Sequence, residues 1–466
     1  MNNEYLEPLN NVDAAWRHME DPSNLMMVTG VIVLEDAVPI ETIKDIVSRG
    51  LSKHDRFRQK VVDVGVMKAP HWSSVGDLDW DYHLQTITLA GQDAKAEVNR
   101  EVNRLMSEGL DFDYPLWQVH LIQPVGPGCA VLLRIHHCIA DGMALLGVLL
   151  SLTGPSAEAS LELAAVSDVE NLSSSGNLFR QATNVLGKAS RLTSKLVRGY
   201  FDTLIHPSKI LDFARVGSEG AKTTARMLMR QEDPRTLFRG ELGVPKLAAW
   251  SRPVPLQKVK EIKQVTGSTV NDVLLAAMSG ALRQYLVGKG ESVDGLDFHA
   301  AVPVNLRDPR QRAKLGNEFG IVFLSLPVGI ADPLERIFEV RRRMEELKAS
   351  PEAIISFALL KAVGATPVEV QKAIVNLFGS KTTAVMTNVP GPKTHLYMAG
   401  SKIETLMFWV PQSGRVGLGV SILSYAGEVR LGVATDQGLV PDPEEIIHGF
   451  HRELDAMWGL YENVRN

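Results

Sequence analysis

Residues 131–146 read VLLRIHHCIADGMALL. The apolar run before the two histidines predicts a strand, Asp141-Gly142 predicts a tight turn, and the apolar residues after it predict a helix. A sheet holds the side chains at a strand end, while the loop leaves them reachable. With 12 His and 38 Gly in 466 residues, two adjacent histidines with a glycine five positions after the second are expected about 0.025 times by chance. The motif is therefore a candidate site.

His137 is the candidate general base of this motif, because imidazole titrates near neutral pH and takes protons from hydroxyls or thiols. Asp141 could orient that ring or brace the turn, and Gly142 would let the chain reverse at an angle that other residues resist. A packed or surface histidine is the commoner explanation of a lone His beside a strand. A metal site is the second functional alternative. However, neighbours on a strand point to opposite faces, so His136 and His137 should not both reach one ion.

Length and composition indicate a globular protein of two domains. A chain of 466 residues exceeds one ordinary core, and its 45% hydrophobic and 22% charged residues are typical of folded proteins. The net charge of −5 gives no reason to expect nucleic acid as a partner. Cys129 and Cys138 provide no disulfide framework, which suits a reducing compartment. The polar N-terminus does not resemble a signal peptide, and no apolar run reaches about 18 residues. A cytoplasmic protein, soluble or peripheral to a membrane, is expected.

Hydrophobic periodicity predicts strands and helices in both halves of the chain. We therefore expect two related α/β lobes, one from each half, each with a mixed sheet and flanking helices. In the first half we expect helices over 11–16, 39–51 and 94–105, and strands over 26–34, 61–66, 118–123 and 129–136, the last two as a hairpin. In the second half we expect helices over 256–265, 270–285, 333–348, 354–377 (largely buried) and 443–460. Strands are expected over 298–304, 319–326, 383–387, 404–409, 417–423 and 429–435, with a rigid turn at 388–392.

The character of the sequence changes between the two halves. Residues 156–176 are rich in Ala, Ser and acidic side chains, as in a linker, and residues 177–230 carry ten Lys or Arg against three Asp or Glu. Apolar residues interleave with these cations, a pattern that suits an anionic lipid surface. A solvated crossover between domains explains the pattern equally well. We therefore divide the chain into an N-terminal lobe (1–153), a basic helical crossover (154–250) and a C-terminal lobe (251–466).

Over nearly its whole length the chain resembles the bacterial wax ester synthase/diacylglycerol acyltransferase family. The His-His-x3-Asp-Gly block alone is also similar to chloramphenicol acetyltransferase, plant alcohol acyltransferases and nonribosomal condensation domains. The Pro-Leu-Trp, Asn-Asp and Asn-Val-Pro-Gly-Pro blocks together narrow the resemblance. All the matching blocks are Pro115-Leu116-Trp117, His136-His137 with Asp141-Gly142, Asn271-Asp272, Pro303-Val304-Asn305-Leu306-Arg307 and Asn388-Val389-Pro390-Gly391-Pro392. The bland alternative for Pro115-Leu116-Trp117 is a buried corner.

The resemblance implies two chloramphenicol acetyltransferase-like lobes with an active-site tunnel at their junction. It implies acyl-CoA as donor and co-substrate, diacylglycerol or a fatty alcohol as acceptor, and no metal or other cofactor. A monomer or homodimer at the inner membrane face or on lipid inclusions is expected.

In that setting His137 would deprotonate the acceptor hydroxyl. The Asn271 amide is the candidate donor to the oxyanion, because Asp272 carries no proton at neutral pH. Asp141 is expected to be structural, paired with an arginine that the sequence does not identify, and His136 to be a packing or tunnel-wall residue.

Two alternatives from other classes stay open. A condensation-type module that takes its acyl group from a carrier protein shares the His block. A catalytically inactive lipid-binding protein is the other, although intact His137 and Asp141 count against it. Neither acyl chain length nor the choice between diacylglycerol and fatty alcohol follows from the sequence.

Overall fold

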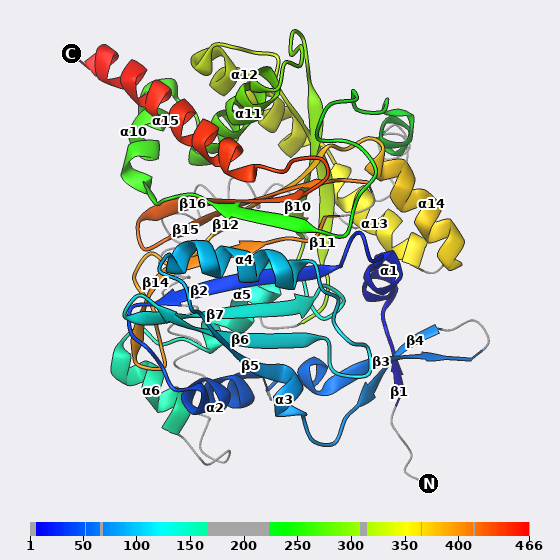
Figure 1. Ribbon diagram of the computed structural model, residues 1–466. Helices are drawn as coiled ribbons and strands as arrows, with labels where there is room; N and C mark the ends of the chain where they lie inside the picture. Colours follow the sequence, from blue (N-terminus) through cyan, green and yellow to red (C-terminus); the bar gives the residue numbers. More distant parts are fainter. Residues whose placement is uncertain are drawn as a thin grey trace.

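The computed structural model describes residues 6–51, 53–65, 69–165, 223–307, 315–364, 366–412 and 415–465. These residues form two lobes, each built on its own sheet with flanking helices (Figure 1). A small third sheet of order β1-β4-β3 lies beside the first lobe. The predicted mixed α/β fold of two lobes is confirmed. The small sheet consists of β1 (Leu6–Pro8), β3 (Gln59–Val64) and β4 (Ala69–Ser74).

The first sheet carries the strand that leads to the two histidines. Its order is β13-β14-β2-β7-β6-β5, and the β5–β6 pair is parallel. All nine residues of β7 are buried, because it is flanked by β2 and β6 and apolar side chains cover both faces. The predicted hairpin is present as β6 and β7. The strands are β2 (Met27–Leu34), β5 (Leu84–Thr88), β6 (Trp117–Val125), β7 (Gly128–His136), β13 (Tyr397–Met398) and β14 (Ser401–Trp409).

The second sheet has the order β11-β10-β12-β15-β16-β8, and β9 pairs with β16 beside this path. β12 runs parallel to both of its neighbours, and the other pairs are antiparallel. The strands are β8 (Lys246–Trp250), β9 (Val254–Pro255), β10 (Phe298–Asn305), β11 (Phe319–Leu326), β12 (Ala384–Pro390), β15 (Leu418–Tyr425) and β16 (Glu428–Asp436).

Helices cover the second sheet and fill the space beside both lobes. α10, α11, α12 and α15 lie together over one face of the second sheet (Figure 1). α1 lies where the lobes meet and packs against α13 and α14. The helices are α1 (Asn11–Met19), α2 (Ile40–Leu51), η1 (Asp55–Arg58), α3 (Trp80–His83), α4 (Ala94–Met106), α5 (Gly142–Ser151), α6 (Ala157–Ala165), α10 (Leu256–Thr266), α11 (Val270–Gly288), α12 (Pro333–Ala349), α13 (Glu352–Gly364), α14 (Val368–Gly379) and α15 (Pro443–Arg465).

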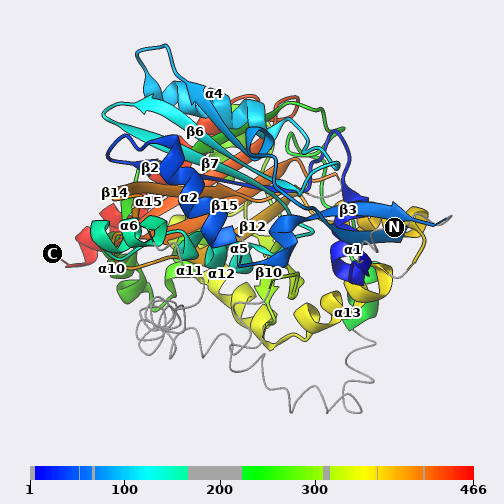
Figure 2. The same ribbon diagram turned by 90° about the horizontal axis from the view of Figure 1, so that it is seen from below.

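The sheets do not follow the predicted division of the chain at 153 and 250. β14, from the second half, pairs with β2 and extends the first sheet, as the view from below shows (Figure 2). β8 precedes residue 251 but forms the edge of the second sheet. The second half therefore contributes a strand to the first sheet, and the second sheet includes the last residues of the predicted crossover. Residues 166–222, which hold most of the predicted basic crossover, lie outside the described residues.

The predicted buried helix over 354–377 is wrong in two respects. It is two helices, because Pro367 precedes α14 and a proline cannot continue a helical hydrogen-bond ladder. In α13 only Glu352 and Ala353 are buried, and in α14 only Gln371 and Gly379. The two helices pack against α1 and β11 and leave other faces open, so their apolar composition does not reflect burial.

The predicted turn at 388–392 begins later than expected. Asn388 and Pro390 lie within β12, opposite Ile422 and Ser424 of β15. Gly391 then donates its backbone N–H to the Ser424 carbonyl at 2.8 Å. A Cβ at Gly391 would lie 2.4 Å from that oxygen, so glycine permits this close approach.

Candidate active site at the end of strand β7

His137 follows β7 directly and is enclosed by groups from both lobes. Its backbone N–H donates to the Met26 carbonyl at 2.7 Å, and its own carbonyl accepts from the Asn317 amide at 2.8 Å. The indole of Trp16 stacks on the imidazole, with ring centroids 4.1 Å apart and an interplanar angle of 19°. Phe319 of β11 lies 5.8 Å from the same ring. The imidazole is therefore held in one orientation.

The His137 ring is neutral at physiological pH. Burial lowers its pKa from 6.5 to about 4, because the charged form loses its hydration. The negative charge of Asp141, the His137 backbone oxygen and Asn317 act in the opposite direction, and His136 adds to the lowering. Nδ1 is buried and makes no well-aligned hydrogen bond within the described residues. The ring is thus in the form that can accept a proton.

His136 points away from its neighbour and ties the strand end to the α1–β2 loop. Its Nδ1 accepts from the backbone N–H of Cys138 at 3.0 Å, so Nε2 is the ring nitrogen that carries a proton. Nε2 donates to Glu20 at 2.6 Å. Burial acts to raise the pKa of Glu20, but this hydrogen bond and the contact with the Met26 N–H leave it below the usual value. His136 is a structural residue in this arrangement.

Asp141 joins the two lobes. As the N-cap of α5 its carboxylate accepts from the Ala144 N–H at 2.9 Å. From the other lobe it accepts from both terminal nitrogens of Arg307, at 3.2 and 2.8 Å, and from the Glu318 N–H at 3.1 Å. Asp141 and Arg307 are only 4% and 3% exposed. The arginine that the sequence left open is Arg307, and the carboxylate is fully used in this brace.

Asn317 links the His137 backbone to a buried carboxylate. Its Nδ2 donates to the His137 carbonyl and to Asp13 of α1, each at 2.8 Å. Burial raises the pKa of Asp13 to about 7, although hydrogen bonds from Asn317 and Asn10 and the charge of Arg56 act to lower it. α1 is therefore fastened to the segment that follows Arg307.

The amide pair of Asn271 and Asn388 forms a second group. Nδ2 of Asn388 donates to Oδ1 of Asn271 at 2.7 Å. Among the described residues this pair shares no hydrogen bond with the His137 group. Val389, beside Asn388, belongs to the same continuous hydrophobic core as Ile139, which places the end of β12 toward the first lobe. Asp272 is a capping residue, because it exchanges hydrogen bonds with Thr269 in a capping box.

Two family comparisons now identify the chain. Residues 9–274 match the wax ester synthase/diacylglycerol acyltransferase catalytic domain, and residues 315–458 match the WS/DGAT C-terminal domain. The chain belongs to the wax ester synthase/diacylglycerol acyltransferase family. It is an acyltransferase, as its sequence motifs predict.

Relatives and solved structures agree with this assignment. A Mycobacterium tuberculosis (strain CDC 1551 / Oshkosh) protein named as a diacylglycerol O-acyltransferase is 26% identical over 97% of this chain and 90% of its own length. The wax ester synthase/diacylglycerol acyltransferase from Marinobacter aquaeolei VT8 has a TM-score of 0.69 and 20% identity, covering 98% of this chain and 100% of that one. The first condensation domain of the calcium-dependent antibiotic synthetase has a TM-score of 0.63 and 14% identity, covering 99% and 97%. Both structural likenesses show the shared fold.

Two other family motifs, Pro115-Leu116-Trp117 and the block that contains Asn305, make structural contacts near the His137 group. The Leu116 carbonyl accepts from the His136 N–H at 3.0 Å, immediately after Pro115. Trp117 is buried, with its indole N–H on the Phe57 carbonyl at 2.9 Å, as in the bland alternative of a buried corner. Asn305 accepts from the Arg307 backbone N–H at 3.0 Å and so shapes the turn that presents Arg307.

The expectation for Gly142 is wrong. Its φ lies outside the left-handed region, and a Cβ there would meet no atom within 4 Å. The chain reverses through the Asp141 cap instead, and Gly142 is the first residue of α5. Reasoning from the sequence also did not identify four residues of the site: Trp16, Asp13, Asn317 and Glu20. The one available signal was an Asp and a Trp on the inner face of a short helix, which reads equally well as ordinary packing.

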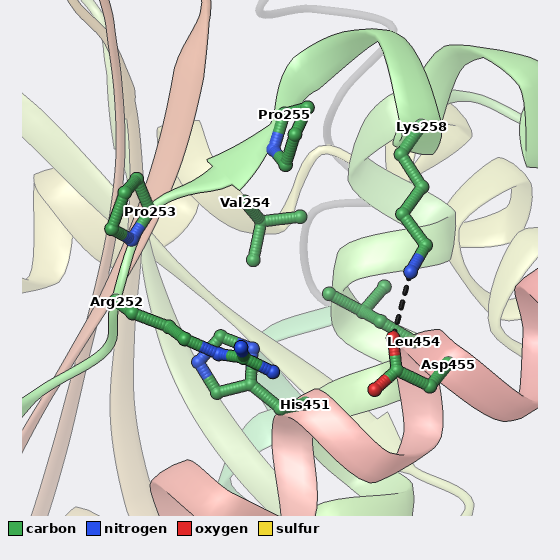
Figure 3. Close-up of a pocket in the computed structure, with 8 residues that line it drawn as sticks. All are labelled: Arg252, Pro253, Val254, Pro255, Lys258, His451, Leu454 and Asp455. Atoms are coloured by element: carbon green, nitrogen blue, oxygen red, sulfur yellow. Dashed lines mark hydrogen bonds and ion pairs between the residues drawn. The ribbon is translucent and has the colours of Figure 1, made fainter.

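Two surface cavities lie away from His137 and are not lined by it. One of about 240 Å³ opens between β9, α10 and α15, beside the 2.7 Å ion pair of Lys258 and Asp455 (Figure 3). Another of about 310 Å³ is lined by Arg235, Arg239 and Glu291, among others. Among the described residues, no three His, Cys, Asp or Glu side chains are grouped to hold a metal ion. No helix in the described part of the chain is long and apolar enough to cross a membrane.

Proposed function

We propose that this enzyme transfers a long-chain acyl group from acyl-CoA to the hydroxyl of diacylglycerol or a fatty alcohol, with His137 as general base. The products are triacylglycerol or a wax ester and free coenzyme A. The names of the mycobacterial and Marinobacter relatives support the acceptor classes. The observation that carries the role of His137 is its neutral ring, enclosed at the junction of the two lobes between Trp16 and Phe319.

The reaction needs one proton carrier and no metal. The enclosed Nδ1 leaves Nε2 as the atom that takes the proton from the acceptor hydroxyl. The acceptor oxygen attacks the thioester carbonyl carbon, and the tetrahedral oxyanion then expels the sulfur. His137 returns its proton to the leaving thiolate, so the ring ends each cycle neutral.

Asn271 is the proposed donor to the oxyanion. Asn388 donates to its Oδ1, which leaves the Asn271 Nδ2 as a preoriented donor at the first turn of α11. Asp141 takes no part in proton transfer in this proposal, because its carboxylate is occupied by Arg307 and two backbone N–H groups.

We also propose that the enzyme meets its water-insoluble acceptor at a cytoplasmic membrane face or lipid inclusion, as a monomer or homodimer. The charge of residues 177–230 supports this, because ten cations against three anions attract anionic lipid.

Thiol release and lipid products test the proposed function together. Purified enzyme is given a long-chain acyl-CoA with a diacylglycerol or a fatty alcohol, and free thiol and ester are both measured. Equimolar thiol and ester are expected with at least one acceptor. Ester formed only from a carrier-protein thioester would identify the condensation-type alternative, and lipid binding without any turnover would identify an inactive protein.

A further inference from the structure

Trp16 presents its ring face to the candidate base. It is 7% exposed, stacks on His137 at 4.1 Å between centroids, and lies 5.9 Å from Phe319. Within the described residues its indole Nε1 is buried without a hydrogen-bond partner. A buried indole normally satisfies this N–H. The position of Trp16 therefore serves the contact between the two rings.

The helix that carries Trp16 also has anchors that do not involve the His137 segment. The Asn10 side chain caps α1 by accepting from the Val12 and Asp13 N–H groups. Toward the second lobe, Asn11 donates to the Lys361 carbonyl at 3.2 Å, and His18 lies 3.2 Å from the Gln371 side-chain oxygen. α1 is thus held against α13 and α14, and its Trp16 indole forms a wall beside the imidazole.

A fixed aromatic face acts differently on the two states of His137. The ring quadrupole attracts a cation over its face, most strongly where water is excluded, and gives a neutral imidazole no such gain. His137 is neutral at rest and becomes charged only when it takes the acceptor proton. Asp141, the carboxylate whose charge acts on His137, is already paired with Arg307. The indole face is then the group best placed to stabilise the new charge.

We propose that Trp16 is a positioning residue that holds the His137 ring and stabilises the imidazolium formed during acyl transfer. This inference rests on the proposed role of His137. Interactions that strengthen only in the transition state raise kcat and leave KM unchanged. Trp16 should therefore affect turnover rather than substrate binding.

Fluorinated tryptophan tests this without changing the packing much. Fluorine withdraws electron density from the ring face, so protein grown on mono-, di- and trifluorotryptophan should lose kcat in graded steps with KM unchanged. We expect about a 20-fold loss for trifluorotryptophan, or about 1.8 kcal/mol at 1.36 kcal/mol per tenfold, within the range of a desolvated cation–π contact. The chain has 7 Trp, so the control is Trp16→Phe grown on the same analogues, which labels every other position. Its kcat should not change with fluorination.

The outcomes separate this inference from the proposed function. An unchanged kcat across the series, in an enzyme that needs His137, would overturn the role of Trp16 alone. An equal fall in the Trp16→Phe series would assign the effect to another tryptophan and also overturn it. Full turnover of a His137→Gln variant would instead overturn the proposed role of His137 as general base, on which this inference rests. Melting temperatures of each sample show that the fold is retained.

Discussion

Replacing Asp141 is expected to weaken the contact between the two lobes and so to lower the free energy of unfolding. Asp141→Ala leaves Arg307 buried without its carboxylate, and breaking a buried pair from one side costs about 3–5 kcal/mol. The variant also loses the cap of α5, worth about 1 kcal/mol. We therefore expect Asp141→Ala to lower the free energy of unfolding by about 4–6 kcal/mol, and Arg307→Ala by about 3–5 kcal/mol.

A double-mutant cycle measured by urea unfolding isolates the pair. The double variant should lose at least about 2 kcal/mol less than the sum of the single variants, because the same contact is removed in both. The matched control is Glu453→Ala, which breaks a buried pair with Arg336 inside the second lobe at 2.5 Å. It should destabilise the protein by a similar amount but leave kcat of the folded enzyme nearly unchanged. Asp141→Ala should lower kcat as well, because the lobe junction holds His137.

Two results would refute this reasoning. Strict additivity of the two single variants would mean that Asp141 and Arg307 are not coupled across the junction. Wild-type stability of Asp141→Ala with turnover abolished would mean that the carboxylate acts in the chemistry and not as a brace.

Three further predictions follow from the site and the sequence. Asn271→Ala should lower kcat by about 100-fold or more with little change in melting temperature. Asp272→Ala should instead lower the free energy of unfolding by about 1 kcal/mol, because a helix cap is lost. Equal destabilisation by both variants would mean that Asn271 is only a capping residue. The raised pKa of Asp13 means that the folded protein holds a proton that the unfolded chain releases near pH 4, so this stability is present at low pH and is lost as pH rises through about 7. Asp13→Asn should remove this pH dependence, a difference of up to about 4 kcal/mol between pH 4 and pH 8 in unfolding experiments, and parallel curves for both proteins would contradict the burial argument. In liposome flotation the enzyme should bind anionic vesicles at low salt and detach at high salt, and changing Lys188, Arg191, Lys195 and Arg198 to Gln should weaken binding; binding that ignores lipid charge, salt and these substitutions would leave residues 177–230 as a crossover only.

Local pattern in the sequence predicts most of the fold. Apolar runs, helical periodicity and capping residues place β7, α1 and α11 within a few residues of their observed bounds, because those signals lie within one element. The pairing of β14 with the first sheet and of β8 with the second could not be predicted, since strand order depends on pairing between segments hundreds of residues apart. The prediction that the helix over 354–377 is largely buried failed for a related reason. The apolar composition of α13 does not say which of its faces another element covers.

The site likewise contains residues that the sequence indicates and residues that only the structure reveals. His137 and Asp141 belong to one short motif, so their spacing alone indicates them. Trp16, Asp13 and Asn317 reach the histidine from segments that carry no motif, and only the packing of α1 at the lobe junction brings them there. Arg307 lay in a recognised block, but its pairing with Asp141 spans 166 residues and needed the structure.

The most direct test of the account is the loss and chemical rescue of the base. His137→Ala leaves a ring-sized space between Trp16 and Phe319, so added imidazole should restore part of the lost thiol release in a saturable way. The matched control is His120→Ala, which removes another buried imidazole whose pKa burial lowers to about 3, on β6. We predict that His137→Ala abolishes turnover, that imidazole rescues it, and that His120→Ala keeps near-normal turnover and does not respond to imidazole. Near-normal turnover of folded His137→Ala without imidazole would contradict the central claim.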